Sequence, residues 1–247
     1  METTRTAAAL VIGNELLTGK IQDLNIAVLA KELFGLGVEL RRVVMCGDEV
    51  EVIAADLNLL RSDHDVVFTS GGVGPTHDDV TVRAVARAFN VGVVRSRRIE
   101  ALLRGYLGDR CTQDHLRMAD IPDGADLVSS ESVQWPTVRM GNVYVLPGLP
   151  EVFAMKMATV RAHVVGGAPF VSRSVPTSSD EGAIASLLET LVDRFPGVAI
   201  GSYPRWGDGP VRVTVSFDGR DAAAVERAAA AFVAALPPDQ LVAEPGV

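Results

Sequence analysis

Short apolar segments alternate with amphipathic ones along the first two thirds of the chain. Three segments have the length and composition of β-strands: 7–12, 38–46 and 66–68. Each is followed by a segment whose apolar side chains recur at the spacing of one helix face. These helical segments cover residues 23–36, 49–60 and a stretch beginning near Asp78 and Asp79. The alternation predicts an α/β domain with a mostly parallel sheet and helices on both faces.

Later segments extend this pattern with a hairpin and a long helix. Residues 138–140 and 143–146 predict a strand pair around the turn Gly141-Asn142. A helix is predicted from the proline-rich turn 147–151 to about His163, because proline is tolerated at a helix start. The intervening segment 91–119 is predicted to be mostly helical and charged.

The pattern changes after Gly166-Gly167-Ala168-Pro169, which reads as a linker. The segments beyond it are predicted as strand 170–176, helix 180–194, strand 197–203, strand 211–217 and helix 221–236. This βαββα order with short connections predicts a small α+β unit. The expected domains are therefore 1–166 and 170–247.

Helix starts carry candidate capping residues. Asp48 precedes the helix over 49–60, and either Ser179 or Asp180 is expected to cap the first helix of the second domain. Aspartate is a favoured N-cap because its carboxylate accepts a hydrogen bond from a backbone amide of the first turn. Asp78 and Asp79 can also be explained as carboxylates of a helix start.

A glycine-rich loop follows the strand over 66–68. Gly71, Gly72 and Gly74 allow a positive φ or a close approach of the backbone to a ligand. A strand, a glycine loop and a helix start together make the usual anion site of an open α/β sheet. A Walker A loop would need a Gly-Lys-Ser/Thr sequence, and a dinucleotide fingerprint would need glycine where His77 stands. Neither a P-loop NTPase nor an ordinary Rossmann dehydrogenase is supported.

Residues 71–81 resemble a known family signature. They match Gly-Gly-x-Gly-Pro-Thr-x-Asp-Asp-x-Thr at every fixed position. This spelling is similar to the molybdopterin-binding (MogA/MoaB-like) domain, and most closely to competence/damage-inducible protein A and eukaryotic FAD synthase. Gly-Asn-Glu-Leu-Leu-Thr-Gly at 13–19 and Pro-Gly-Leu-Pro-Glu at 147–151 resemble the same branch. The resemblance covers nearly the whole chain but none of the adenylyltransferase or amidase regions found in that branch.

The resemblance implies metal-dependent hydrolysis of the pyrophosphate bond of a nucleotide diphosphate such as FAD or ADP-ribose. Glu15, Asp78 and Asp79 are the expected catalytic residues and the ligands of a Mg, Mn or Co ion, which binds carboxylates and phosphate oxygens together. No tightly bound organic cofactor is expected to be required. The residues expected to contact the ligand are Asn14, Ser70, Gly71, Gly72, Gly74, Thr76, Pro147 and Gly148.

Several other residues are less strongly indicated as functional. His77 could act as a general base, although a loop histidine is more often plain surface. Trp135, Trp206 and Tyr203 could stack on a ligand ring, but they are more often core or interface aromatics. The arginines of 91–119 are mostly expected on a solvated face, with the alternative that one or two reach a ligand phosphate: Arg95, Arg97, Arg98, Arg104 and Arg110.

Composition limits the classes of partner. The 247 residues include 48% hydrophobic and 22% charged residues, and the net charge is −8, which argues against sequence-independent binding to nucleic acid or to anionic membranes. No apolar run approaches a membrane span, and the N-terminus does not resemble a secretory signal. Cys46 and Cys111 are isolated, as in a reduced cytoplasmic protein. We therefore expect a cytoplasmic protein with a small-molecule ligand. The family resemblance further implies a homo-oligomer, either a dimer or a trimer.

Two alternatives to hydrolysis stay open. One is a non-hydrolytic module that binds molybdopterin or its adenylylated form, as the wider superfamily does. The other is an inactive regulatory domain. The Gly-Pro-Thr-x-Asp-Asp spelling of 74–79 favours the hydrolase over both, because it belongs to the competence-protein branch.

Overall fold

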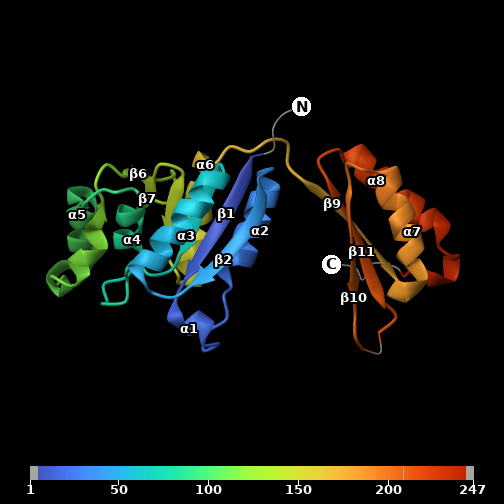
Figure 1. The fold of residues 1–247 in the computed structure, drawn as a ribbon, viewed down its shortest axis with the longest axis horizontal. Coiled ribbons are helices and arrows are strands. Elements are labelled where there is room, and N and C mark those ends of the chain that lie inside the picture. Colours follow the sequence, from blue (N-terminus) through green and yellow to red (C-terminus); the bar gives the residue numbers. More distant parts are fainter. Residues whose placement is uncertain (1–4, 208, 243–247) are drawn as a thin grey trace. The chain divides into compact units, whose positions relative to one another are not determined.

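The computed structural model of the protein describes residues 5–207 and 209–242. The chain divides into two compact units, Met1–Gly167 and Ala168–Val247, and each is described by itself (Figure 1).

The first unit is built on a six-stranded sheet in the order β2-β1-β3-β8-β7-β6. Its strands are β1 (Thr6–Ile12), β2 (Glu39–Cys46), β3 (Val66–Ser70), β6 (Asp126–Val128), β7 (Thr137–Met140) and β8 (Val143–Leu146). The pairs β2–β1, β1–β3 and β3–β8 are parallel, whereas β8–β7 and β7–β6 are antiparallel. The predicted mostly parallel sheet is confirmed, including the hairpin of β7 and β8.

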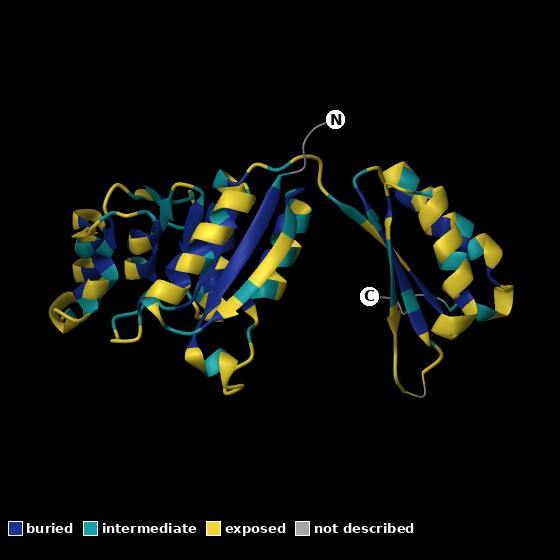
Figure 2. Ribbon diagram, in the orientation of Figure 1, coloured by how far each residue is buried: buried dark blue, intermediate teal, exposed yellow. Residues whose placement is uncertain are grey.

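Helices cover both faces of this sheet because its central strands are apolar on both sides. Side chains of β1 alternate between the faces, and all seven of its residues are buried (Figure 2). Ala7 and Ala9 pack with α2 (Asn25–Gly35) and α6 (Pro150–His163). Ala8, Leu10 and Ile12 pack with the other pair of helices. That pair is α3 (Val50–Asp63) and α4 (Thr81–Ala88).

A smaller cluster lies beside α4. It contains α5 (Arg97–Leu107), the 3₁₀ turns η1 (Gly108–Arg110) and η2 (His115–Ala119), and a ribbon of β4 (Val93–Arg95) with β5 (Asp120–Pro122). Ile99, Leu103 and Leu116 form its core, and Trp135 packs against them. The segment predicted as mostly helical is therefore helical in its middle, with short strands that a three-residue pattern does not reveal.

The second unit is a three-stranded antiparallel sheet with two helices. The strand order is β10-β11-β9, from β9 (Val171–Thr177), β10 (Ala199–Pro204) and β11 (Val213–Gly219). The helices α7 (Glu181–Arg194) and α8 (Ala222–Ala235) lie on one face of this sheet, and Phe217 and Phe232 meet in the core between them. The short turn η3 (Pro238–Gln240) follows α8. The predicted βαββα order is confirmed.

The predicted helix caps have different outcomes. Asp180 caps α7 by accepting a hydrogen bond from the amide of Ala183. Asp48 does not cap α3, because Glu49 holds the N-cap position without a side-chain bond. The carboxylate of Asp48 instead accepts a 3.0 Å hydrogen bond from the amide of Asn14, at the start of the short helix α1 (Asn14–Leu17). The prediction for Asp48 is thus wrong, because a loop from a neighbouring strand competes for its carboxylate.

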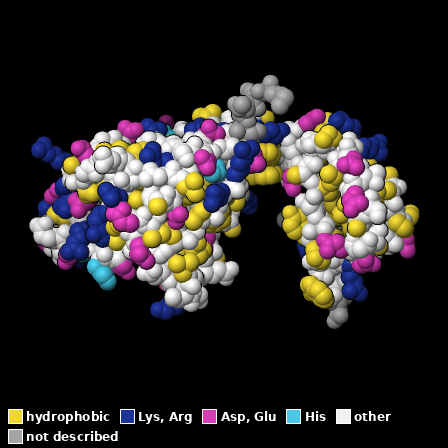
Figure 3. Space-filling model, in the orientation of Figure 1, with side chains coloured by type: hydrophobic (Ala, Val, Ile, Leu, Met, Phe, Trp, Pro, Cys, Tyr) yellow, Lys and Arg dark blue, Asp and Glu magenta, His cyan; other side chains and the backbone are white. Residues whose placement is uncertain are grey.

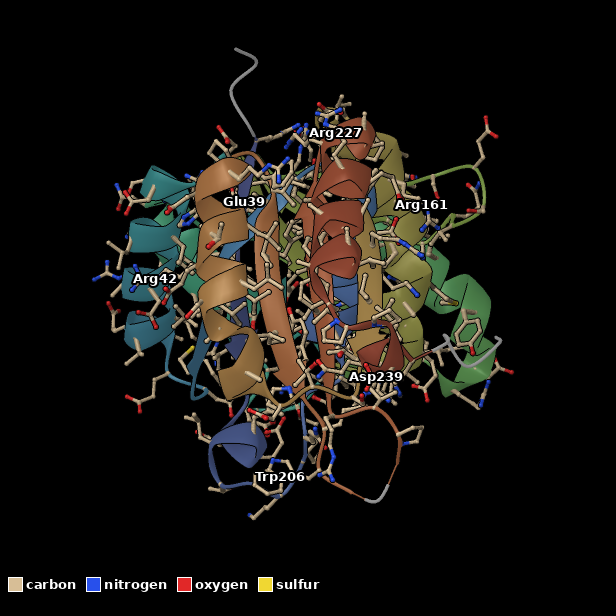
Figure 4. All side chains as sticks on the ribbon, turned by 90° about the vertical axis from the view of Figure 1, so that its right-hand side faces the viewer. Glu39, Arg42, Arg161, Trp206, Arg227 and Asp239 are labelled. Atoms are coloured by element: carbon tan, nitrogen blue, oxygen red, sulfur yellow. The ribbon has the colours of Figure 1, made fainter. Side chains whose placement is uncertain are left out.

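No helix among residues 5–207 and 209–242 is long and apolar enough to span a membrane. Charged side chains of both signs are interspersed over the face of the first unit seen in Figure 3. Trp206, in the loop between β10 and β11, is 98% exposed (Figure 4).

Candidate functional site

The glycine loop is held against the ends of three strands and the start of α4. Gly71 has φ 105° and Gly72 has φ 64°, a region that favours glycine. A Cβ added to Gly71 would lie 2.2 Å from the carbonyl oxygen of Ile12, at the end of β1. The hydroxyl of Thr81 donates to the carbonyl of Gly71 at 2.8 Å, and its amide donates to the carbonyl of Gly72. Strand end, loop and helix start therefore form one rigid block.

Three consecutive amides of this loop are open to a ligand. The amide of Gly71 is used, because it donates to the carbonyl of Leu146 at 3.2 Å. Within the described part of the chain, the amides of Gly72, Val73 and Gly74 have no internal acceptor. Successive unpaired amides form a concave site for an anion. The predicted phosphate-binding role of this loop is therefore geometrically available at Gly72 and Gly74.

Asp79 closes the loop instead of starting the helix. Its carboxylate accepts hydrogen bonds from the amide and the hydroxyl of Thr76 at 2.7 and 2.5 Å. Helix α4 begins only at Thr81, and Val80 is its N-cap. The explanation of Asp78 and Asp79 as carboxylates of the first helical turn is therefore wrong, since the loop is two residues longer than expected.

The loop forms one wall of a pocket of about 740 Å³ in the first unit. Other parts of the wall come from α6, from the β4–β5 ribbon with η2, and from the segment before β7. The residues that line it are Gly72, Val73, Gly74, Thr76, His77, Asp79, Val82, Arg83, Val93, Ile99, Arg117, Met118, Asp120, Trp135, Pro136, Val138, Val145, Pro147, Val152 and Lys156. The pocket thus joins open amides to apolar side chains and to cations.

Lys156 is the most buried charged residue of this pocket. Helix α6 places it on the inner side with Phe153 and Val160, and only 4% of its surface is exposed. Its ammonium donates to the carbonyl oxygens of Trp135 at 2.6 Å and Pro136 at 2.9 Å. Burial lowers the pKa of Lys156 to about 8, because the charged form loses its hydration.

Two arginines and one further carboxylate complete the charged lining. Arg117 pairs with Asp114 at 3.1 Å, and Arg83 projects from the first turns of α4 without an ion pair in the described part of the chain. Asp120 pairs with Arg95, which holds the β4–β5 ribbon together. Arginine binds phosphate through parallel hydrogen bonds, so Arg83 and Arg117 suit an anionic ligand.

Several predicted ligand contacts do not line this pocket. Ser70 is buried and accepts a 2.9 Å hydrogen bond from Asn25, which also donates to the carbonyl of Gly148. Gly148 packs on Gly71, since an added Cβ would lie 3.2 Å from the Cα of Gly71. Ser70, Asn25 and Gly148 thus support the loop from outside the pocket, whereas the amide of Asn14 donates to Asp48 in the loop after β2. Among the predicted contacts, those that line the pocket are Gly72, Gly74, Thr76 and Pro147.

The three predicted metal ligands are not brought together. Asp79 lines the pocket, whereas Asp78 and Glu15 do not. Glu15 lies on α1, and its carboxylate packs beside Gly13. A Cβ added to Gly13 would lie 2.4 Å from an oxygen of that carboxylate. Among the residues that the structure describes, no group of three or more His, Cys, Asp or Glu side chains is arranged to hold a metal. Asp79 alone fits an ion that takes its other ligands from substrate phosphates and water.

Some of the other candidate residues line the pocket, and others do not. His77 lines the pocket, but its side chain is 95% exposed. Trp135 lines the pocket as well, whereas Tyr203 and Trp206 belong to the second unit. The suggested phosphate-binding arginines of 91–119 do not line it: Arg95, Arg97, Arg98, Arg104 and Arg110. Arg117, which lies in the same segment, was not singled out by the sequence and does line it.

The position of Lys156 in the sequence already indicates that it is buried. It stands three residues after Phe153 and four before Val160, so it falls on the apolar face of its helix. A lysine on a buried face is rare unless it is paired or functional. Arg83 and Arg117 left no comparable signal, because exposed arginines are ordinary on helices and turns.

Two known protein families match most of the chain. Residues 8–166 match the family described as "Probable molybdopterin binding domain". The chain belongs to the molybdopterin-binding domain family. Residues 169–245 match a second family, described as the FAD synthase middle domain. The resemblance to this branch, stated from the motifs, is confirmed.

Relatives of the family cover the chain to different extents. A protein of Archaeoglobus fulgidus is 31% identical over 90% of this chain and 93% of its own length. A CinA-like protein of Frankia casuarinae is 34% identical over 89% of this chain, but only 55% of its own length is matched. This chain therefore spans about half of that longer relative.

A solved structure supports the fold of the first unit. The crystal structure of CinA from Thermoplasma acidophilum, a protein of unknown function, matches 65% of this chain and 99% of its own with a TM-score of 0.59 and 25% identity. This similarity supports the family's fold for the first unit.

Proposed function

We propose that the pocket binds a nucleotide diphosphate, such as FAD or ADP-ribose, and that the protein hydrolyses the pyrophosphate bond with a divalent metal ion. One observation carries the proposal. The open amides of Gly72, Val73 and Gly74 share one pocket with two arginines and Trp135. Amides and arginines suit phosphate groups, and an indole ring suits the base or flavin attached to them.

Different residues of the pocket would bind the phosphates, balance their charge and hold the metal ion. The amides of Gly72 to Gly74 would hold non-bridging phosphate oxygens, and Arg83 and Arg117 would balance the negative charge on the phosphoryl oxygens. Asp79 would hold a Mg, Mn or Co ion on the substrate phosphate. Such an ion polarises the phosphoryl group and lowers the pKa of bound water. The hydrogen bonds from Thr76 fix the Asp79 carboxylate for this task.

A second candidate function has its own support. Glu15 and Asp78 lie outside the pocket lining, so the site holds fewer carboxylates than the hydrolase hypothesis assumed. A site of open amides, arginines and a tryptophan equally suits a pterin that carries a phosphate, bound without hydrolysis. Product analysis separates the two: a hydrolase releases AMP from ADP-ribose in the presence of metal, whereas a binding module leaves ADP-ribose intact.

Replacing Trp135 with alanine is expected to weaken ADP-ribose or FAD binding by about 5- to 150-fold, because stacking on an aromatic side chain contributes roughly 1–3 kcal/mol. The measurement is calorimetric titration in the presence of EDTA, which prevents turnover. Trp206→Ala is the matched control, since Trp206 is 98% exposed and belongs to the second unit. Equal affinities for the two variants would remove Trp135 from the site.

We also propose that the protein self-associates and acts in the cytoplasm. Apolar side chains gather near β2 and α1 (Figure 3), where Leu17 is 57%, Val43 45% and Met45 42% exposed. β2 is an edge strand, and exposed apolar edges favour association. The free thiols of Cys46 and Cys111 suit a reducing compartment. Light scattering of the purified protein would give a dimer or larger, and a monomer at micromolar concentration would exclude self-association.

A further inference from the structure

Lys156 has a donor left over after its internal bonds are made. Its ammonium carries three protons. Two of them are accounted for by the carbonyl oxygens of Trp135 and Pro136, at 2.6 and 2.9 Å. These two bonds fix the nitrogen at the wall of the pocket, where the side chain is 4% exposed. The remaining N–H has no acceptor within the described part of the protein.

The charge of Lys156 is also uncompensated. No carboxylate of the described residues lies within ion-pair distance of its nitrogen. The two carboxylates that share the pocket are engaged elsewhere, Asp79 with Thr76 and Asp120 with Arg95. A buried cation without a partner is costly, and its interaction with an anion is strong in a poorly hydrated site.

We propose that Lys156 recognises the negative charge of the ligand by donating its remaining N–H to an acidic phosphate oxygen. The proposal rests on the pocket being the ligand site of the proposed function, but it does not require hydrolysis. It predicts that the ligand carries an acidic group within hydrogen-bond distance of the Lys156 nitrogen. Arg83 and Arg117 add exposed positive charge, whereas Lys156 supplies a buried donor in a fixed position.

The alternative is a purely structural role for Lys156. Its ammonium could serve only to hold the segment 135–136 in place through the two carbonyl oxygens. Two substitutions separate the roles. Lys156→Gln replaces the ammonium with an uncharged amide that still has two N–H donors for these carbonyl oxygens. Lys156→Met keeps an unbranched side chain, one heavy atom shorter than that of lysine, and removes both the donors and the charge.

Calorimetric titration with inorganic pyrophosphate and with ADP-ribose, both in EDTA, tests the proposal. Both variants are expected to bind each ligand about 10- to 100-fold more weakly than the natural protein, as for loss of a charge-assisted hydrogen bond. Lys31→Met, on the outer face of α2, is the matched control and should bind as the natural protein does. Natural affinity in Lys156→Gln together with weak binding in Lys156→Met would overturn the proposal, because positioning would then suffice.

The pH dependence of ADP-ribose binding gives a readout that needs no variant to fold. The lysine binds the anion in its protonated form, so affinity should fall as pH rises through the pKa of about 8. The other ionisable groups of the pocket are His77, Asp79, Arg83, Arg117 and Asp120. None of these residue types ordinarily titrates between about pH 7.5 and 9.5. Binding about tenfold weaker at pH 9 than at pH 7 supports the proposal, and a flat profile contradicts it.

The experiments distinguish a failure of the Lys156 proposal from a failure of the proposed function. Pyrophosphate binding that depends on Lys156, without turnover of ADP-ribose, would leave Lys156 as the anion contact of a binding module. Turnover in the natural protein with unaltered binding in both Lys156 variants would leave the hydrolase and remove the Lys156 contact. Binding of neither pyrophosphate nor ADP-ribose to the natural protein would overturn both.

Discussion

Replacing Asp79 with asparagine is expected to lower the rate of ADP-ribose hydrolysis by about 10²- to 10³-fold, the size of effect seen when a preorganised electrostatic group is removed from an active site. Asparagine keeps an oxygen that can accept from the amide of Thr76, so the loop should stay closed. What it removes is the negative charge that would hold the metal on the substrate phosphate. The measurement is AMP release under metal saturation, with the melting temperature recorded for both proteins.

Asp78→Asn is the matched control for this prediction. Asp78 neighbours Asp79 in the same loop and loses the same charge, but it does not line the pocket. Its rate should stay within about threefold of the natural rate, as expected when a solvent-exposed charge is changed. Equal losses in the two variants would mean that the charge of the loop matters rather than the position of Asp79. No loss in Asp79→Asn would remove Asp79 from the mechanism.

Gly71→Ala is expected to have the largest effect on stability, a loss of about 2–4 kcal/mol. Two causes add. The backbone at Gly71 has φ 105°, which L-residues rarely adopt, and the new methyl group would lie 2.2 Å from the carbonyl oxygen of Ile12. That carbonyl belongs to the buried central strand and cannot move aside. For a domain of this size the melting temperature should fall by roughly 4–16 °C in calorimetry.

Gly92→Ala serves as the comparison for Gly71→Ala. Gly92 is exposed, its φ is not in the left-handed region, and an added Cβ meets no atom within 4 Å. Its melting temperature should lie within about 2 °C of the natural protein, as for a surface substitution. A similar loss in both variants would mean that the alanine side chain itself, rather than the contact with Ile12, lowers stability.

Much of the fold could be predicted from the chain because its central elements are long and strongly patterned. The strand over 7–12 and the helix over 23–36 show their burial in the spacing of apolar residues. The order of elements then requires a parallel sheet covered on both faces. The strands β4, β5 and β6 escaped prediction, because three residues are too few to show a period of two.

The glycine wall of the pocket could be predicted, but its other walls could not. The loop at 71–79 carries its chemistry in consecutive residues, so its motif is visible in the sequence. Arg117, Trp135 and Lys156 reach the pocket from segments about 40 to 80 residues further along the chain. Only tertiary folding brings them together, and no local pattern specifies that arrangement.

The predicted carboxylate cluster shows a different limit. Loops at the carboxyl ends of parallel strands face the same crevice, which suggested that Glu15 would meet Asp78 and Asp79. The short helix α1 instead turns back toward β2, where the amide of Asn14 binds Asp48. Two loops at the same edge of a sheet have backbones that lie near each other, but this does not determine where each side chain points.

The measurement that tests the central claim most directly is product analysis of the natural protein incubated with FAD and with ADP-ribose, each with magnesium, manganese or cobalt. We expect metal-dependent release of AMP, together with FMN from FAD or ribose phosphate from ADP-ribose, and loss of this release in Asp79→Asn. Intact substrates with every metal, combined with tight binding of a phosphorylated pterin, would contradict the hydrolase and establish a binding module in its place.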